Sequence, residues 1–150
     1  MQVILFLVRN KKYSISEQYA SLHAHFTQNA YVQWMHDGFT WYCDVTPSEL
    51  SDTYTLKVVY RQFGFPEVYV VKPKPLKLAD GAKRLPHTYD SNRQKLCLFY
   101  PLYNEWDRTK LLSNTIMHWA IRWLYYYEEW AYSGKWKGGG HGNHDAVFQE

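Results

Sequence analysis

The chain has 150 residues, of which 46% are hydrophobic and 21% are charged, a balance that suits one globular domain and excludes a disordered protein. Its net charge of +3 is too small for a nucleic-acid-binding surface, so we expect no nucleic-acid partner. The hydrophobic run of residues 3–8 (VILFLV) is far shorter than the roughly 20 residues that span a bilayer, which argues against a membrane protein. We expect an extra strand in residues 1–14 instead. Two cysteines make no disulfide framework, so we expect free thiols and a cytoplasmic location.

The first predicted helix covers residues 16–30. Within it, Tyr19, Leu22 and Phe26 recur at three- and four-residue steps, which indicates one buried face of a short helix. Ser16 is the predicted N-cap, because a serine hydroxyl can accept a hydrogen bond from a free backbone N–H of the first turn.

Three predicted strands follow, at residues 39–45, 54–61 and 67–72. Each is rich in β-branched and aromatic side chains, and turn-forming residues such as Pro47 and Gly64 separate them. Because these connections are short, they favour an antiparallel meander over parallel strands joined by crossovers.

A long irregular segment comes next. Residues 74–92 are interrupted by Pro75, Gly81 and Pro86, and ordered loops of this length in a small domain are usually functional. The lysines at the start of this segment alternate with prolines, which favours a solvated loop over a phosphate-binding site. The short apolar segment of residues 96–100 then follows.

The C-terminal part predicts a long helix over residues 108–132. That range has neither Pro nor Gly, and its large apolar side chains recur at helical steps: Leu112, Ile116, Trp119, Trp123, Tyr127 and Trp130. The pattern allows one helix, or two helices that meet near His118. Gly134 is the predicted left-handed C-cap, and residues 138–150 open with three glycines and are predicted to form a loose tail. The order of elements indicates a single α+β domain over residues 1–150.

One cysteine has the surroundings of a reactive thiol. Cys97 follows the long polar loop and lies between two leucines, with His87 ten residues before it and Trp106 nine residues after it. Arg93 and Lys95 supply positive charge nearby, which favours the reactive thiolate form. The alternative that these residues leave open is a buried and inert cysteine.

Other chemistries find less support. A cysteine protease built on Cys97 and His87 would need a third orienting group, which the sequence does not mark. His141 and His144 do not match the spacing of a closed zinc site, so we expect no metal and no cofactor. Cys43 lies in a strand-like run, and we expect Cys97 rather than Cys43 to be the reactive thiol.

Residues 15–142, most specifically residues 85–141, resemble a bacterial branch of the ubiquitin-conjugating enzymes, found in anti-phage CBASS operons beside a cyclic-oligonucleotide synthase. Ubiquitin-conjugating enzymes have a His-Pro-Asn motif, a catalytic cysteine ten residues after its histidine, and then a tryptophan. The bacterial branch has PH-x-Y, LCL-x-x-P and later G-x-W-x-GGG-x-H. The matching residues here are Pro86, His87, Tyr89, Leu96, Cys97, Leu98, Pro101, Trp106, Thr115, Ile116, Trp119, Trp123, Leu124, Tyr127, Glu128, Trp130, Gly134, Trp136, Gly138, Gly139, Gly140 and His141.

The resemblance implies a ubiquitin-conjugating-enzyme-like fold with an N-terminal helix, an antiparallel meander and a long C-terminal helix. It also implies that Cys97 forms a thioester with the C-terminus of a partner, a cyclic-oligonucleotide synthase of the nucleotidyltransferase class. The acyl group would then pass to an acceptor amine or be released. His87 would order the loop through hydrogen bonds or act as a base, and Trp106 would pack the loop after the nucleophile.

Some positions depart from the wider family. Tyr89 replaces the Asn that helps to stabilise the oxyanion during lysine attack, so the resemblance implies thioester formation more strongly than lysine transfer. The Tyr89 hydroxyl can donate one hydrogen bond, or the side chain can simply pack. Asp107 or Glu105 can help to deprotonate an incoming amine, or can cap a helix start. Arg122 and Cys43 replace Glu and Gly of the bacterial pattern, which we interpret as tolerated variation.

Two rival functions remain open at this point. The first is a non-catalytic binding module of the same fold, against which the retained Cys97 argues. The second is an aromatic nucleic-acid-binding domain, which the dispersed basic residues disfavour.

Overall fold

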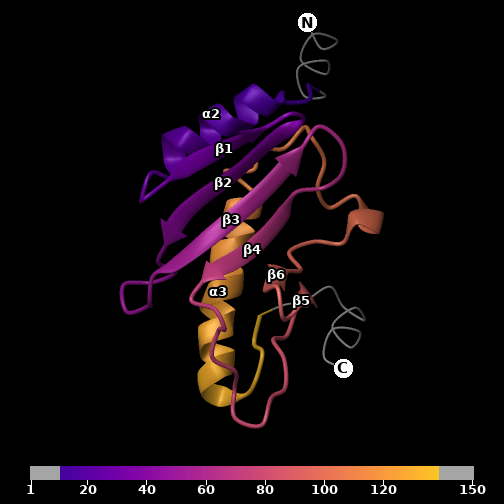
Figure 1. The fold of residues 1–150 in the computed structure, drawn as a ribbon. Helices are drawn as coiled ribbons and strands as arrows, with labels where there is room; N and C mark the ends of the chain where they lie inside the picture. The colour runs from indigo at the N-terminus through magenta and orange to yellow at the C-terminus, as the bar shows by residue number, and fades with distance from the viewer. Residues whose placement is uncertain (1–10, 139–150) are drawn as a thin grey trace, which may run out of the picture.

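A computed structural model describes residues 11–138, which form an N-terminal helix, a sheet and a C-terminal helix (Figure 1). Of the strand predicted in residues 1–14 and the tail predicted in residues 138–150, only residues 11–14 and 138 are described, and they belong to no helix or strand. The elements are α2 (Ile15–His25), β1 (Tyr31–Met35), β2 (Gly38–Val45), β3 (Tyr54–Arg61), β4 (Glu67–Lys72), β5 (Thr88–Asp90), β6 (Lys95–Leu96), the 3₁₀ helix η1 (Pro101–Tyr103) and α3 (Ile116–Ser133).

The six strands form one sheet in the order β1-β2-β3-β4-β6-β5, and every neighbouring pair is antiparallel. The three predicted strands are confirmed as β2, β3 and β4, and β2 begins one residue earlier than expected. With β1 they form a four-stranded antiparallel meander, within the three or four strands that the sequence predicted, and the short β6 and β5 extend the sheet beyond β4. The α+β class with a helix at each end of the chain is confirmed.

Helix α2 begins and ends earlier than predicted. Its N-cap is Ser14, whereas Ser16 lies inside the first turn. The Glu17 N–H donates to the Ser14 hydroxyl and the Ser14 N–H donates to the Glu17 carboxylate, each at 3.1 Å, which completes a capping box. The helix stops before Phe26, whose φ of −129° is not helical, and Asn29 takes a left-handed φ of 48°. The chain can therefore turn directly into β1.

The long C-terminal helix begins eight residues later than predicted, because tertiary hydrogen bonds hold the preceding backbone. Gln18 of α2 is fully buried. Its amide donates to the Lys110 carbonyl, and its side-chain oxygen accepts from the Leu112 N–H, both at 2.8 Å. These backbone groups are thereby tied to α2, and residues 108–115 form turns instead of helix.

From its start, α3 is continuous, so the break that the sequence allowed near His118 is not present. Gly134 has a φ of 78° and its N–H donates to the Trp130 carbonyl at 2.7 Å, which confirms the predicted left-handed C-cap. Helix α3 lies against one face of the sheet, and α2 lies beside β1 (Figure 1). The buried side chains of α3 are Ile116, Met117, Ala120, Trp123, Leu124, Tyr127 and Trp130.

The core forms where this helical face meets the inner face of the sheet. Along β3, buried and half-buried residues alternate, and Leu56, Val58 and Tyr60 are fully buried. The β4, β6 and β5 side of the sheet lies opposite β1, and the segment after β6 leads to η1 (Figure 1). This side carries the candidate site.

Candidate functional site

The candidate nucleophile, Cys97, lies directly after β6. Its N–H donates to the His87 carbonyl at 3.0 Å, which links the end of β6 to the start of β5. The side chain is buried, with 3% of its surface exposed. Burial is the alternative that the sequence left open for this cysteine. Any molecule that reacts with the sulfur therefore has to displace neighbouring groups.

A buried glutamine holds the turn that leads into β6. Gln94 accepts a hydrogen bond from the Leu76 N–H at 2.7 Å, and its amide donates to the carbonyls of Val70 and Pro73 at 2.8 and 3.0 Å. Three bonds from one buried side chain fix the long loop against β4. The sequence did not indicate this role, because a single Gln in a polar loop is expected to be exposed to solvent.

His87 orders the loop before the nucleophile, chiefly through its backbone. It is buried and takes a left-handed φ of 48°, which is uncommon for a residue other than glycine. Its carbonyl accepts from the Cys97 N–H and also from the Trp123 indole N–H, the latter at 2.9 Å. Its ring stacks on Trp136 with the centroids 4.5 Å apart and the planes 26° apart. One carbonyl thus connects the nucleophile to α3.

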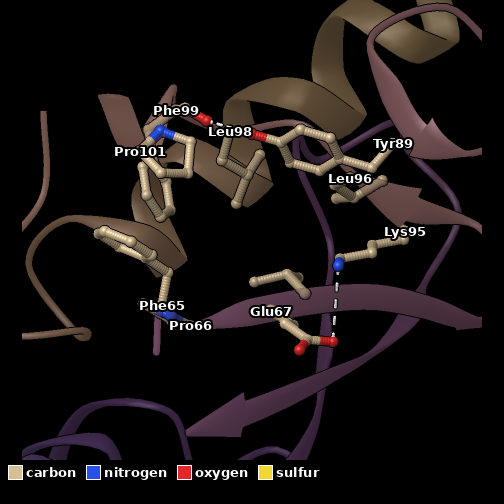
Figure 2. Close-up of a pocket in the computed structure, with 10 residues that line it drawn as sticks. Phe65, Pro66, Glu67, Tyr89, Lys95, Leu96, Leu98, Phe99 and Pro101 are labelled. Atoms are coloured by element: carbon tan, nitrogen blue, oxygen red, sulfur yellow. Dashed lines mark hydrogen bonds and ion pairs between the residues drawn. The ribbon is translucent and has the colours of Figure 1, made fainter. Parts of the chain in front are cut away.

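Tyr89 lies beside the candidate nucleophile. Its hydroxyl donates to the Phe99 carbonyl at 2.5 Å, so its ring bridges β5 and the segment after Cys97 (Figure 2). Burial raises the pKa of the Tyr89 hydroxyl, and the charge and hydrogen bonding of the neighbouring Cys97 thiol raise that pKa further. The phenol therefore stays a protonated hydrogen-bond donor well above neutral pH.

The two basic residues that were expected to favour the thiolate have aromatic partners. Arg93 lies over the Tyr69 ring at 5.2 Å, and its guanidinium also donates to the Tyr69 hydroxyl at 3.3 Å. Lys95 lies over the Tyr89 ring at 5.5 Å and pairs with Glu67 at 3.7 Å. Lys95 thus contacts the ring of Tyr89, the residue that neighbours Cys97.

Trp106 packs behind the loop that follows the nucleophile. It is 2% exposed, and its indole N–H donates to the Thr115 hydroxyl at 2.9 Å. Its ring centroid lies 5.9 Å from that of Tyr60 and 6.5 Å from that of Phe99, so it supports the residue whose carbonyl Tyr89 binds.

The two candidate carboxylates occupy different environments. Asp107 accepts from the N–H of Thr109 at 2.8 Å and from the Thr109 hydroxyl, and these bonds hold the pKa of Asp107 below its usual value. It therefore stabilises a turn, and the helix start it was expected to cap lies further on, at Ile116. Glu105 is half-buried, and its charge contributes to the raised pKa of Tyr89. Of the two, only Glu105 is among the groups that affect the Tyr89 pKa.

An apolar pocket opens next to these residues, with a volume of about 310 Å³. Figure 2 shows Phe65 on one side, facing Phe99 and Pro101, with Tyr89 and Leu98 across the space. The Phe65 and Phe99 ring centroids are 5.9 Å apart. The complete lining is Phe65, Pro66, Glu67, Val68, Tyr89, Lys95, Leu96, Leu98, Phe99 and Pro101. The two direct neighbours of Cys97 in the chain thus line a space that suits an apolar side chain of a ligand.

Over residues 11–138, no group of three or more His, Cys, Asp or Glu side chains is arranged to hold a metal ion. Within the same range, no helix has the length and apolar character needed to cross a membrane. His141 and His144 lie outside the described residues.

The sequence of the whole chain was then compared with known proteins. The profile of the family described as "Type II CBASS E2 protein" matches residues 18–145. The chain belongs to this family. A search of curated proteins gave no significant match. The match confirms the resemblance that the Cys97 and Trp136 motifs predicted, and it makes the chain an E2-like protein of CBASS anti-phage systems.

Proposed function

We propose that this CBASS E2 protein carries an acyl group as a thioester on Cys97. The thiolate sulfur bonds to an activated C-terminal carbonyl carbon of a partner protein, and the bond from that carbon to its leaving group breaks. The observation that carries the proposal is the placement of Cys97. Its N–H is bonded to the His87 carbonyl, its thiol neighbours the Tyr89 hydroxyl, and its two adjacent leucines line an apolar pocket.

In this proposal the partner is the cyclic-oligonucleotide synthase of the same CBASS system, and an apolar side chain near its C-terminus occupies the pocket. The acyl group is then released to water or passed to an acceptor amine, whose nitrogen attacks the thioester carbonyl and expels the Cys97 thiolate. The protonated Tyr89 hydroxyl donates to the oxyanion of each step. In this proposal Glu105 takes the proton that an attacking amine loses.

The cellular compartment follows from the thiol chemistry. Cys43 and Cys97 are both reduced thiols in the structure. A thioester-forming thiol has to stay reduced, so we propose that the protein works in the cytoplasm.

A second candidate function is a non-catalytic binding module of the same fold. The observation that favours it is the 3% exposure of Cys97, since a cysteine with this burial is commonly an inert core residue. The two candidates differ in whether a covalent bond forms at Cys97.

The deciding experiment uses a synthetic peptide thioester with the C-terminal sequence of the synthase encoded beside this chain. Incubation with the wild-type protein should give a covalent adduct that a thiol reductant removes. Cys97→Ser should give only an adduct that resists the reductant, because an oxyester has no exchangeable sulfur. Cys97→Ala should give none.

The matched control is Cys43→Ala, which removes the other buried cysteine and should keep the adduct. Circular dichroism should show that both alanine variants remain folded. An adduct that persists in Cys97→Ala, or no adduct with the wild type, would overturn the thioester proposal in favour of the binding module.

A further inference from the structure

The chain reverses direction after α3 and returns to the candidate site. Gly134 makes the turn with its left-handed φ of 78°, and the Lys135 N–H donates to the Ser133 hydroxyl at 3.1 Å. Figure 1 shows the segment after α3 running back along the helix toward β5 and β6. We call residues 134–138 the C-terminal strap.

The strap is held by aromatic packing around Trp136. Its ring stacks on His87 at 4.5 Å, and its centroid lies 5.6 Å from the Trp123 ring and 6.1 Å from the Tyr126 ring. Three rings from two other segments thus surround one indole. Aromatic pairs in these geometries stabilise a structure beyond the apolar area that they bury.

The glycine at position 138 is required by the same packing. A Cβ atom there would lie 2.5 Å from Cδ2 and 2.7 Å from Cγ of Tyr126, and 2.9 Å from the Trp136 Nε1. These distances are shorter than real side-chain contacts, and the ring atoms involved cannot give way without moving the stack. The spacing G-x-W-x-G over residues 134–138 therefore has a physical basis: a turn, a stacking ring and a close approach.

The stack contacts His87, a residue with an unfavourable backbone conformation. His87 is not a glycine, yet it has a φ of 48°, a conformation that L-residues adopt at a cost in free energy. This conformation directs its carbonyl to the Cys97 N–H at 3.0 Å. The Trp123 indole holds the carbonyl from one side, and Trp136 holds the ring.

We propose that Trp136 is a positioning residue for Cys97 that acts through His87. By stacking on the imidazole, it keeps His87 in its left-handed conformation and so keeps the Cys97 backbone in the place where its thiol meets Tyr89. The role of Trp136 in acyl transfer rests on the thioester function proposed above, whereas its control of the Cys97 backbone does not.

The first experiment is independent of any partner. Amide hydrogen exchange, followed by NMR, reports the bond between the Cys97 N–H and the His87 carbonyl directly. Trp136→Leu should lower the protection of the Cys97 amide by about tenfold or more while the protection of amides in β3, such as Val58, changes little. Trp136→Phe, which keeps a stacking ring, should retain most of the protection. Gly138→Ala should resemble Trp136→Leu, because its Cβ displaces the stack.

Tyr132→Leu is the matched control, since it removes a ring that is 96% exposed near the same end of α3. It should leave the Cys97 amide unchanged. If Trp136→Leu leaves the Cys97 amide protected, or lowers the protection of Cys97 and β3 amides in parallel, Trp136 has only a general structural role and the inference is wrong.

The second experiment measures the rate of adduct formation with the synthase peptide thioester. Trp136→Leu should lower this rate by at least about tenfold, because a small misplacement of a reacting group has a large effect on rate. Trp136→Phe should restore most of it. A wild-type adduct that forms equally fast in Trp136→Leu would overturn the positioning role and leave the thioester proposal intact. A wild type that forms no adduct would overturn the thioester proposal, while the exchange data would still decide whether Trp136 controls the Cys97 backbone.

Discussion

Tyr89 replaces the asparagine of the wider family with a donor of a different kind. An asparagine amide offers two N–H groups, whereas the phenol offers one O–H that it can lose at high pH. Here the raised pKa keeps that proton in place well above neutral pH, and the Phe99 carbonyl accepts a hydrogen bond from the hydroxyl. In the proposed reaction, the hydroxyl would leave the Phe99 carbonyl and donate to the more strongly charged oxyanion.

This exchange of acceptors predicts the behaviour of Tyr89→Phe. If the hydroxyl stabilises the oxyanion, its removal should lower the rate of thioester formation by about 10²–10³. Alkylation of Cys97 by iodoacetamide passes through no oxyanion and should change little. The two rates should be measured in one protein preparation in a Cys43→Ala background, with Tyr31→Phe on β1 as the control. A rate of thioester formation within about threefold of the wild type would assign Tyr89 to packing alone.

The structure confirmed those predicted elements that have a strong local sequence pattern. Strands β2, β3 and β4 were found because they are rich in β-branched and aromatic residues and turn formers separate them. Strand β1 was missed because its buried pattern is irregular, and because the turn before it depends on Asn29 in a left-handed conformation. The start of α3 was misplaced because Gln18 removes backbone groups that helical bonds would otherwise use.

The candidate site likewise contains residues that the sequence predicted and roles that it did not. Cys97 and His87 could be named from their spacing and Tyr89 from the family resemblance, and the structure brings these three together. The sequence did not show that His87 acts through a carbonyl, since that role depends on a left-handed φ and on the distant Trp123. Trp136 was visible only as part of a motif. Its partner across the stack is 49 positions earlier in the chain, a contact that no local pattern encodes.

At the scale of elements, Gln18 predicts a measurable link between α2 and the segment before α3. Gln18→Leu should remove both of its hydrogen bonds and leave the Lys110 carbonyl and the Leu112 N–H buried without them. An unsatisfied buried polar group costs about 1–3 kcal/mol, so the free energy of unfolding should fall by roughly 2–4 kcal/mol. Urea denaturation measures this change. Gln28→Leu, an exposed position just after the same helix, should stay within about 0.5 kcal/mol of the wild type. An equal effect at both positions would contradict the bridging role of Gln18.

The whole molecule assembles its site from distant parts of the chain. The loop before β4 supplies Phe65, β5 supplies Tyr89, the segment after β6 supplies Cys97, and the strap after α3 supplies Trp136. These parts meet only because the sheet order places β6 between β4 and β5, with α3 behind them. The reactivity of Cys97 should therefore depend on the integrity of the complete fold rather than on its own segment.

The same fold buries several groups whose ionisation opposes folding, and this predicts how stability depends on pH. Burial raises the pKa of the Cys43 thiol from 9.0 to about 11. Burial likewise raises the pKa values of Tyr69 and Tyr127 from 10.0 to about 12. Each group keeps its proton longer in the folded state than in the unfolded state. Its contribution to stability is therefore fully present below the unfolded pKa and is lost as pH rises through the folded pKa.

The urea midpoint should accordingly be flat from about pH 7 to 8.5 and fall from about pH 9 upward, with a second and steeper decline above pH 10. While one group is protonated only in the folded state, the free energy of unfolding falls by about 1.4 kcal/mol per pH unit. Cys43→Ala should be less stable at every pH because it leaves a cavity, but its decline should begin near pH 10, where the tyrosines alone titrate. Urea titrations of both proteins under reducing conditions test this. A wild-type midpoint that stays constant to pH 11, or a Cys43→Ala curve that runs parallel to the wild type from pH 9, would show that the Cys43 thiol does not couple its ionisation to folding.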